Sequence, residues 1–403
     1  MATAGAISRG DALAVGRRPA DNSLWLAALG ITAGAIYLHS AVSWRQASLF
    51  LVGVFAGIVL YHAAFGFTSS WRVFISDRRG AGLRAQMLML AATCVVFFPL
   101  LASGSAFGQP LRGSVSPAGI PVIAGAFIFG VGMQLGGGCA SGTLYTAGGG
   151  SVRMVVTLGA FILGSVIGTA HAPWWSGQPS WAATSLVTLY GPIGGLAVSL
   201  AAFAAIAYAT VVLEQRRHGR LFEAGKTPRW LRGPWPLVAG AIGLAVVNIA
   251  TLLIAGRPWG VTSAFALWGA KVASQLGIAV HSWPYWTTPA QKAALEASVM
   301  HDVTSVMNFG IIMGALLASF LAGRFAPVWR VPARSLAAAI IGGLLLGYGA
   351  RVAFGCNIGA YFSGIASGSL HGWLWLPAAF AGSMLGTKMR PMFGLSVEGT
   401  RTN

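Results

Sequence analysis

Two cysteine-containing stretches in the two halves of the chain match each other: residues 136–145, GGGCASGTLY, and residues 353–361, AFGCNIGAY. Each follows an apolar run, and each places one glycine directly before the cysteine and another three residues after it. A second matched pair lies further upstream in each half, at residues 66–71, GFTSSW, and residues 260–264, GVTSA. The same order of elements in both halves predicts an internal repeat.

Apolar runs surround these elements over most of the 403-residue chain. Hydrophobic residues make up 56% of the sequence and charged residues only 8%, against about 25% charged in a soluble domain. Runs of about 20 apolar residues can cross a hydrocarbon core about 30 Å thick. The pattern predicts an all-α polytopic membrane protein and excludes a cytosolic enzyme. The ten predicted transmembrane helices cover residues 24–43, 47–65, 85–103, 118–137, 152–171, 191–213, 236–256, 303–322, 335–354 and 370–387.

The single span at 191–213 separates the two copies of the repeat, so the second copy is expected to be inverted relative to the first. Four Gly/Ser-rich elements are too short to span, and we interpret them as half-membrane helices; surface loops are the alternative. These elements cover residues 66–76, 139–150, 260–271 and 356–366. The predicted organisation is a cytoplasmic N-terminal tail (1–23), an extra transmembrane helix (24–46), the first repeat (47–190), a linking helix with a basic cytoplasmic loop (191–234), the second, inverted repeat (235–390) and a cytoplasmic tail (391–403).

The distribution of basic residues predicts the orientation. The chain has 26 Lys and Arg but only 8 Asp and Glu, and basic residues in short loops stay on the cytoplasmic side of a membrane. With both termini in the cytoplasm, most of the basic residues fall in cytoplasmic segments. The basic loop 214–232 is then expected to contact anionic membrane lipid, and no nucleic acid. The basic residues on or near the other side are Arg45, Arg112, Arg257, Lys271, Lys292 and Arg351.

The charge inventory favours an anionic substrate over a cation. All eight acids lie in tails, in loops or at span edges, so we expect no buried carboxylate that would bind a metal cation or relay a proton. The N-termini of half-helices present unsatisfied N–H groups, which suit an oxyanion. Hydroxyl groups near them would donate to the anion or simply cap the helices. Arg351 would attract an anion or extend to the membrane interface. The candidate polar contacts are Thr68, Ser69, Ser70, Ser141, Thr143, Thr262, Ser263 and Asn357.

Cys139 and Cys356 are the principal candidates for substrate contact, because they hold equivalent positions in the two copies. Gly138 and Gly355 would let the backbone approach a ligand, and a thiol donates or accepts weak hydrogen bonds. The alternative for each cysteine is a small buried hydrophobic residue, which is how we interpret Cys94. We predict free thiols, no metal site and no cofactor, since the sequence has neither metal-ligand spacing nor a nucleotide-binding motif.

The paired elements Gly138–Gly142 and Gly355–Gly359 resemble those of the YeeE/YedE family of sulfur-transport membrane proteins, over residues 47–390. The resemblance implies an hourglass-shaped protein of the bacterial inner membrane, with the cysteines at its narrow centre and thiosulfate passing by S–H to sulfur hydrogen bonds. It also implies that a separate TusA-type sulfur carrier takes the cargo in the cytoplasm. Thiosulfate importers of the family use a third cysteine near the first short element, where this chain reads GFTSS at residues 66–70. Another sulfur or selenium anion is therefore an alternative substrate.

One principal hypothesis and two alternatives follow. We predict a permease, not an enzyme, that imports a small inorganic sulfur anion, first of all thiosulfate, through contacts with Cys139 and Cys356. The first alternative is a sulfur-transfer component, in which a thiol with a lowered pKa becomes a persulfide and hands its sulfur to a cytoplasmic acceptor. The second is a structural membrane subunit whose cysteines only pack.

Overall fold

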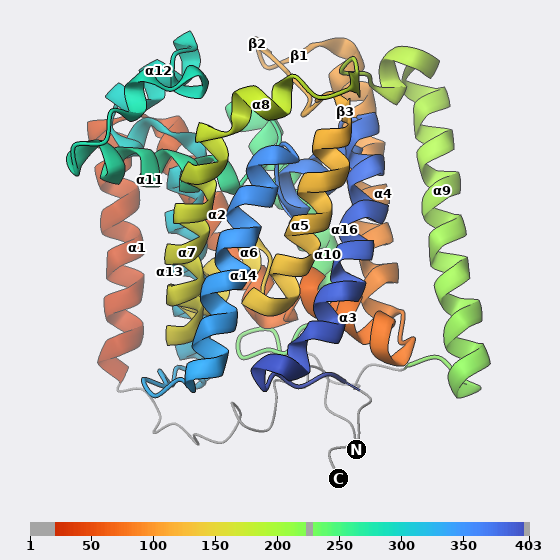
Figure 1. Ribbon diagram of the computed structural model, residues 1–403. Helices are drawn as coiled ribbons and strands as arrows, with labels where there is room; N and C mark the ends of the chain where they lie inside the picture. Colours follow the sequence, from red (N-terminus) through yellow and green to blue (C-terminus); the bar gives the residue numbers. More distant parts are fainter. Residues whose placement is uncertain (1–20, 223–228, 399–403) are drawn as a thin grey trace.

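The computed structural model describes residues 21–222 and 229–398, which form a bundle of long helices running between two faces (Figure 1). We name the face at which α1 begins and α16 ends the terminal face, and the opposite one the distal face. The predicted N-terminal tail lies, up to residue 20, outside the described residues. The long helices are α1 (Asp21–Ala41), α2 (Trp44–Ala63), α4 (Ala81–Ser103), α5 (Ile120–Gly136), α7 (Val152–Ala170), α9 (Leu186–His218), α10 (Leu237–Ala255), α13 (Val303–Leu321), α14 (Ala333–Val352) and α16 (Leu370–Met389).

The prediction of an all-helical, multi-pass membrane protein is confirmed. Within the described residues, nine helical segments are long and apolar enough to cross a membrane. Three of them, residues 44–77, 120–148 and 333–366, join a long helix to the short helix that follows it. The tenth predicted span forms helix α16 but is not among the nine. It is less apolar, because its packed face includes the buried polar side chains of His371 and Ser383.

Short helices occupy the four Gly/Ser-rich segments. They are α3 (Phe67–Asp77), α6 (Ala140–Gly148), α11 (Thr262–Gln275) and a π-helical turn, η4 (Asn357–Phe362), that runs directly into α15 (Ser363–Ala366). Each begins within two residues of its predicted start, and α11 continues four residues beyond its predicted end at 271. Whether these helices reach only half-way into a bilayer stays a prediction.

Helices α5 and α14 lie in the middle of the bundle (Figure 1). α5 packs against α14 and α16, and α14 also packs against α7. α2 packs against α13 and α10, and α10 also packs against α4. Glycines bring the two central backbones together: a Cβ on Gly349 would lie 2.5 Å from the Gly125 carbonyl oxygen, and one on Gly132 would lie 2.7 Å from the Leu346 nitrogen. Small residues allow such close packing between helices in a membrane.

The distal face is built from short connecting elements (Figure 1). Strand β1 pairs with β2 and β3 pairs with β4, both in antiparallel orientation. At the terminal face, a short helical turn, η5 (Arg390–Phe393), follows α16. The connecting elements are β1 (Ser105–Ala106), β2 (Gln109–Pro110), β3 (Ala118–Gly119), α8 (Ala172–Ser176), β4 (Ser180–Trp181), η1 (Val280–Ser282), η2 (Pro284–Trp286), α12 (Pro289–Glu296) and η3 (Val299–His301).

Helix α9 continues beyond its predicted end at residue 213 and overturns one expectation from the sequence. It ends at His218, where Gly219 adopts the left-handed conformation with φ of 70°. Glu214 therefore lies inside the helix, and its side chain is 0% exposed. The expectation that no carboxylate is buried is wrong.

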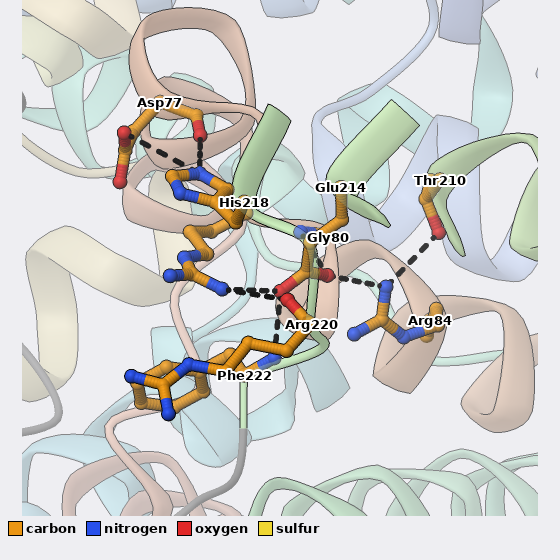
Figure 2. A network of polar contacts seen from close by, with 9 residues as sticks. Asp77, Gly80, Arg84, Thr210, Glu214, His218, Arg220 and Phe222 are labelled. Carbon is orange, nitrogen blue, oxygen red and sulfur yellow. Dashed lines mark hydrogen bonds and ion pairs between the residues drawn. The ribbon is translucent and has the colours of Figure 1, made fainter. Parts of the chain in front are cut away.

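Arginines compensate the charge of this buried carboxylate (Figure 2). Arg84 Nη1 lies 2.7 Å from one Glu214 oxygen and Arg79 Nη1 lies 3.2 Å from the other. The backbone N–H groups of Gly80 and Phe222 donate to the same carboxylate at 3.1 and 2.8 Å. Paired and hydrogen-bonded in this way, a buried charge is tolerated. Glu214 ties the end of α9 to the turn between α3 and α4.

Candidate functional site

Cys139 caps α6, the short helix that follows it. Its backbone is extended, and its sulfur accepts the N–H of Gly142 at 3.4 Å. The Ser141 hydroxyl lies 3.4 Å from the same sulfur, and the Thr143 hydroxyl donates to the Cys139 carbonyl oxygen at 2.8 Å. Helix caps are usually Ser, Thr, Asp or Asn, whose side-chain oxygen accepts this N–H. Here a sulfur atom takes that place, at the positive end of the short helix.

Cys356 caps the second short element, η4, in the same way. Its backbone is also extended, and its sulfur accepts the N–H of Ile358 at 3.4 Å. The Cys356 carbonyl oxygen accepts the N–H groups of Ala360 at 2.9 Å and Tyr361 at 3.2 Å. The Ala360 bond has α-helical spacing and the Tyr361 bond has π-helical spacing. The first turn is thus wider than that of α6, and such π-helical turns are frequent at functional sites.

The glycine before each cysteine is required by a close approach of the backbone. A Cβ on Gly138 would lie 3.1 Å from the backbone nitrogen of Thr143, and one on Gly355 would lie 2.7 Å from that of Ala360. In both elements the crowded nitrogen belongs to the residue five positions after the glycine. Gly355 also has a φ of 148°, which side chains rarely adopt. The two halves therefore share this close backbone approach and the sulfur cap, although the turns that follow differ in width.

The two thiols are buried near each other. Cys139 is 1% exposed and Cys356 is 0% exposed. α6 packs against η4, so the two cysteine elements are neighbours in the fold. The prediction that the three cysteines are free is confirmed. Cys94 is buried in α4, 3.9 Å from the Ile365 carbonyl oxygen, which agrees with a packing residue.

Two of the other predicted contacts lie at or near this pair with unsatisfied polar atoms. Asn357 directly follows Cys356 and is fully buried, and neither atom of its amide has a hydrogen-bond partner in the described chain. The hydroxyl of Thr68, in α3, is also buried without a partner there. The Thr68 carbonyl oxygen accepts the Gln134 amide at 3.2 Å, which joins α3 to the end of α5. Polar atoms left unpaired in this way are available to a ligand.

The remaining predicted contacts are engaged within the protein or lie further away. The Ser69 hydroxyl donates locally to the Gly66 carbonyl oxygen at 3.3 Å. Thr262 is buried in the first turn of α11, whereas Ser263 is exposed and its hydroxyl lies 3.1 Å from that of Thr304. Arg351 donates to the Tyr285 hydroxyl at 2.9 Å, and its guanidinium lies 5.4 Å from that ring centre. The structure therefore does not bring Ser263 and Arg351 to the cysteines.

An aromatic cluster beside the second cysteine was missed by the sequence reasoning. The ring of Tyr361 stacks on that of Trp375 at 6.1 Å, and the edge of Trp71 approaches both. The Tyr361 hydroxyl and the Trp375 indole N–H are buried without a hydrogen-bond partner in the described residues. Tyr361 belongs to the second cysteine element, and its position five residues after Cys356 could have indicated that it lies at the site. Trp375 comes from α16, and no local pattern indicated it.

The site consists of neutral hydrogen-bonding groups and soft sulfur atoms. Within the described residues, no group of three or more His, Cys, Asp or Glu is placed to hold a metal ion. Amide, hydroxyl and indole N–H groups donate to an anion without placing a fixed charge in the protein interior. The arrangement can therefore contact a small anion weakly at several points.

The chain resembles known transport proteins over most of its length. The Sulphur transport family matches residues 62–385, a range that contains both cysteine elements. The chain is 28% identical over 341 residues to the thiosulfate transporter TsuA of Spirochaeta thermophila, covering 80% of this chain and 92% of that relative. It is 24% identical over 336 residues to the thiosulfate transporter TsuA of Escherichia coli, covering 81% and 89%.

A third relative matches over a shorter range. The probable transporter YedE of Escherichia coli is 31% identical over 173 residues, which cover 42% of this chain and 42% of that relative. The chain thus matches less than half the length of YedE. The resemblance to the YeeE/YedE family is confirmed, and the family consists of transporters and not of enzymes. Because the match extends over most of the sequence, the chain belongs to the Sulphur transport family.

Proposed function

We propose that the protein is a permease that imports a small inorganic sulfur anion past Cys139 and Cys356, with thiosulfate as the leading candidate substrate. The observation that supports this most directly is the shared geometry of the two cysteines, each buried and each capping a short helix at 3.4 Å. The TsuA relatives, which match four fifths of the chain, are named as thiosulfate transporters. The missing third cysteine at residues 66–70 leaves a selenium or another sulfur anion as the alternative cargo.

The cysteines would select sulfur anions by weak contacts. The terminal sulfur of thiosulfate is soft and polarizable, so it pairs better with a thiol than a sulfate oxygen does. Asn357 and Thr68, with their unpartnered polar atoms, would bind the oxygen end of the anion. Several weak contacts in sequence favour passage, whereas one strong site would trap the ion.

The packing of the helices supports an inverted repeat over residues 47–190 and 235–390. In such a repeat, the helices of the first copy (α2, α4, α5 and α7) would correspond in order to those of the second (α10, α13, α14 and α16). The packing of α7 against α14 is then matched by the packing of α16 against α5. The contact of α2 with α13 likewise has its counterpart in that of α10 with α4. An hourglass with the cysteines at its centre is the shape that we propose for this arrangement.

We propose the bacterial inner membrane as the location, with the terminal face in the cytoplasm. The turn between α3 and α4 and the end of α9, both rich in arginine, lie at that face (Figure 1), which agrees with the preference of basic residues for the cytoplasm. Membrane lipid would contact the basic segment that continues from α9 to residue 232. A TusA-type sulfur carrier would receive the anion at this face.

Uptake of radiolabelled thiosulfate into proteoliposomes tests the proposal. Unsubstituted protein, Cys139→Ala, Cys356→Ala and the matched control Cys94→Ala are compared, with excess unlabelled sulfate as competitor. We expect saturable uptake that resists sulfate, is lost in either of the first two variants and persists in Cys94→Ala. Uptake that survives removal of both Cys139 and Cys356 would contradict the role of the thiols.

Mass spectrometry of the same protein after exposure to thiosulfate separates the alternative function. A stable extra sulfur atom on Cys139 or Cys356 would indicate a sulfur-transfer component. Both thiols are buried away from any cytoplasmic acceptor. We expect no adduct. A structural subunit would show neither uptake nor adduct.

A further inference from the structure

A carboxylate from the segment after η5 is held by an arginine of the first short helix. Arg72, in α3, donates through Nε and Nη2 to the two oxygens of Glu398, at 2.8 and 2.7 Å. The side chains of Arg72 and Glu398 are only 11% and 19% exposed. This is the two-point geometry with which a guanidinium binds an oxyanion.

Two further arginines lie beside this pair, at the end of α5. Arg390 donates through Nη1 to the Gln134 carbonyl oxygen at 2.5 Å, and Arg153 donates to those of Leu135 and Gly136 at 2.7 and 2.6 Å. These carbonyls belong to the last turn of α5, directly before the glycines that lead to Cys139. The arginines therefore lie next to the first cysteine element, on the side of the terminal face.

The charges of these arginines oppose one another. Burial, followed by the charges of Arg72 and Arg153, lowers the pKa of Arg390 to about 9, while the Glu398 carboxylate raises it. An anion at this place thus offsets the repulsion that Arg72 and Arg153 exert on Arg390. A second negative charge on the anion would relieve it further.

Glu398 is held on Arg72 less firmly than Glu214 is held by its own arginines, so another anion can replace it. Glu214 is held inside a helix by two arginines and two backbone N–H groups, and its side chain is fully buried. Glu398, by contrast, belongs to an irregular segment that follows η5, and Arg390 holds this segment through the Ser396 carbonyl oxygen at 2.9 Å. An anion that binds Arg72 needs to displace only one side chain.

We propose that Arg72 and Arg390 form an oxyanion site between the first cysteine element and the terminal face, and that Glu398 occupies this site until a substrate oxyanion displaces it. The inference deepens the proposed function, on which the choice of a sulfur oxyanion rests. Glu398 acts as a tethered competitor, and its departure lets the anion leave the cysteines toward the terminal face.

Equilibrium binding tests the site separately from transport. Radiolabelled sulfate and thiosulfate are titrated against purified protein with Cys139→Ala and Cys356→Ala already introduced, so that thiol contacts play no part. Without its internal competitor, the site in Glu398→Gln is expected to bind thiosulfate about tenfold more tightly. Glu296→Gln, which removes an exposed acid at the distal face, is the matched control and should leave the affinity unchanged.

Arg72 provides the second arm of the test. Arg72→Lys keeps the charge but loses the two-point geometry, and it should weaken binding in the Glu398→Gln background about tenfold. Equal affinities in Glu398→Gln and Glu296→Gln would overturn the inference. Tighter binding in Glu398→Gln, together with no thiosulfate flux through protein that keeps both Cys139 and Cys356, would support the oxyanion site and contradict the proposed function.

Discussion

Cys139 and Cys356 cap two different helices with the same atom at the same distance: each sulfur accepts a backbone N–H at 3.4 Å. The donors are Gly142 and Ile358, three and two residues after the respective cysteine. Each sulfur is thereby fixed against its own helix without a disulfide partner. This geometry depends on the glycine that precedes each cysteine, which leads to the first prediction.

Gly138→Ala and Gly355→Ala should both destabilise the protein, and Gly355→Ala more strongly. The added methyl group would lie 3.1 Å from the Thr143 nitrogen in the first case and 2.7 Å from the Ala360 nitrogen in the second, where φ is also 148°. Overpacking of this kind costs about 1–3 kcal/mol. Thermal unfolding in detergent measures it. Gly359→Ala is the control, because a Cβ there meets no atom within 4 Å; equal melting temperatures for all three would contradict the packing argument.

Glu214→Gln should lower stability by about 2 kcal/mol. The neutral amide cannot pair with Arg79 and Arg84, and its NH2 group faces donors instead of accepting from them. Glu296→Gln, in an exposed position on α12, should change stability little. Unfolding of both variants in detergent at low and high salt checks the prediction. If Glu214→Gln and Glu296→Gln unfold at the same temperature, the ion pairs of Glu214 with Arg79 and Arg84 do not stabilise α9.

Asn248→Leu should cost about 1–3 kcal/mol, because it leaves a buried backbone N–H without a partner. Asn248, in α10, accepts the N–H of Trp259 at 2.9 Å and donates to the Ser363 hydroxyl at 3.2 Å. The Ser363 hydroxyl in turn donates to the Trp259 carbonyl oxygen at 2.7 Å. A double-mutant cycle with Ser363→Ala measures the coupling. Additive effects of the two substitutions would show that they do not act as one network.

Local patterns predicted the short helices well, because their starts are set by nearby residues. A glycine stands directly before each capping cysteine, in the short stretch between the end of one helix and the start of the next, and this is visible in the sequence around Cys139 and Cys356. The apolar runs likewise predicted the long helices, since length and hydropathy are local quantities.

Contacts between distant segments explain what was missed. Burial of Glu214 depends on Arg79 and Arg84, which lie 135 and 130 residues away. The ion pair between Arg72 and Glu398 joins residues 326 positions apart. Charge at the end of a span predicts an interface location, and only the fold shows which arginine meets which acid. Trp375 was missed for the same reason, because only the fold brings α16 beside Tyr361.

Gly342→Ala should disturb the central helix crossing and the first cysteine element together. A Cβ on Gly342, in α14, would lie 2.6 Å from the Gly136 Cα atom and 2.8 Å from the Gly132 carbonyl oxygen, both backbone atoms of α5 that cannot rotate away. The helices must separate, at a cost of about 1–3 kcal/mol. Gly136 ends α5 just before Gly138 and Cys139, so the displacement reaches the cap.

Gly159→Ala, in α7, is the matched control, because a Cβ there meets nothing within 4 Å and alanine favours a helix by about 1 kcal/mol over glycine. We expect its melting temperature to be unchanged or raised, whereas that of Gly342→Ala falls. The rate at which Cys139 reacts with a small thiol reagent gives the second measurement. It should rise in Gly342→Ala alone, since a loosened crossing exposes a thiol that is now 1% exposed. A fall in melting temperature with unchanged Cys139 reactivity would show that the crossing and the cap are independent.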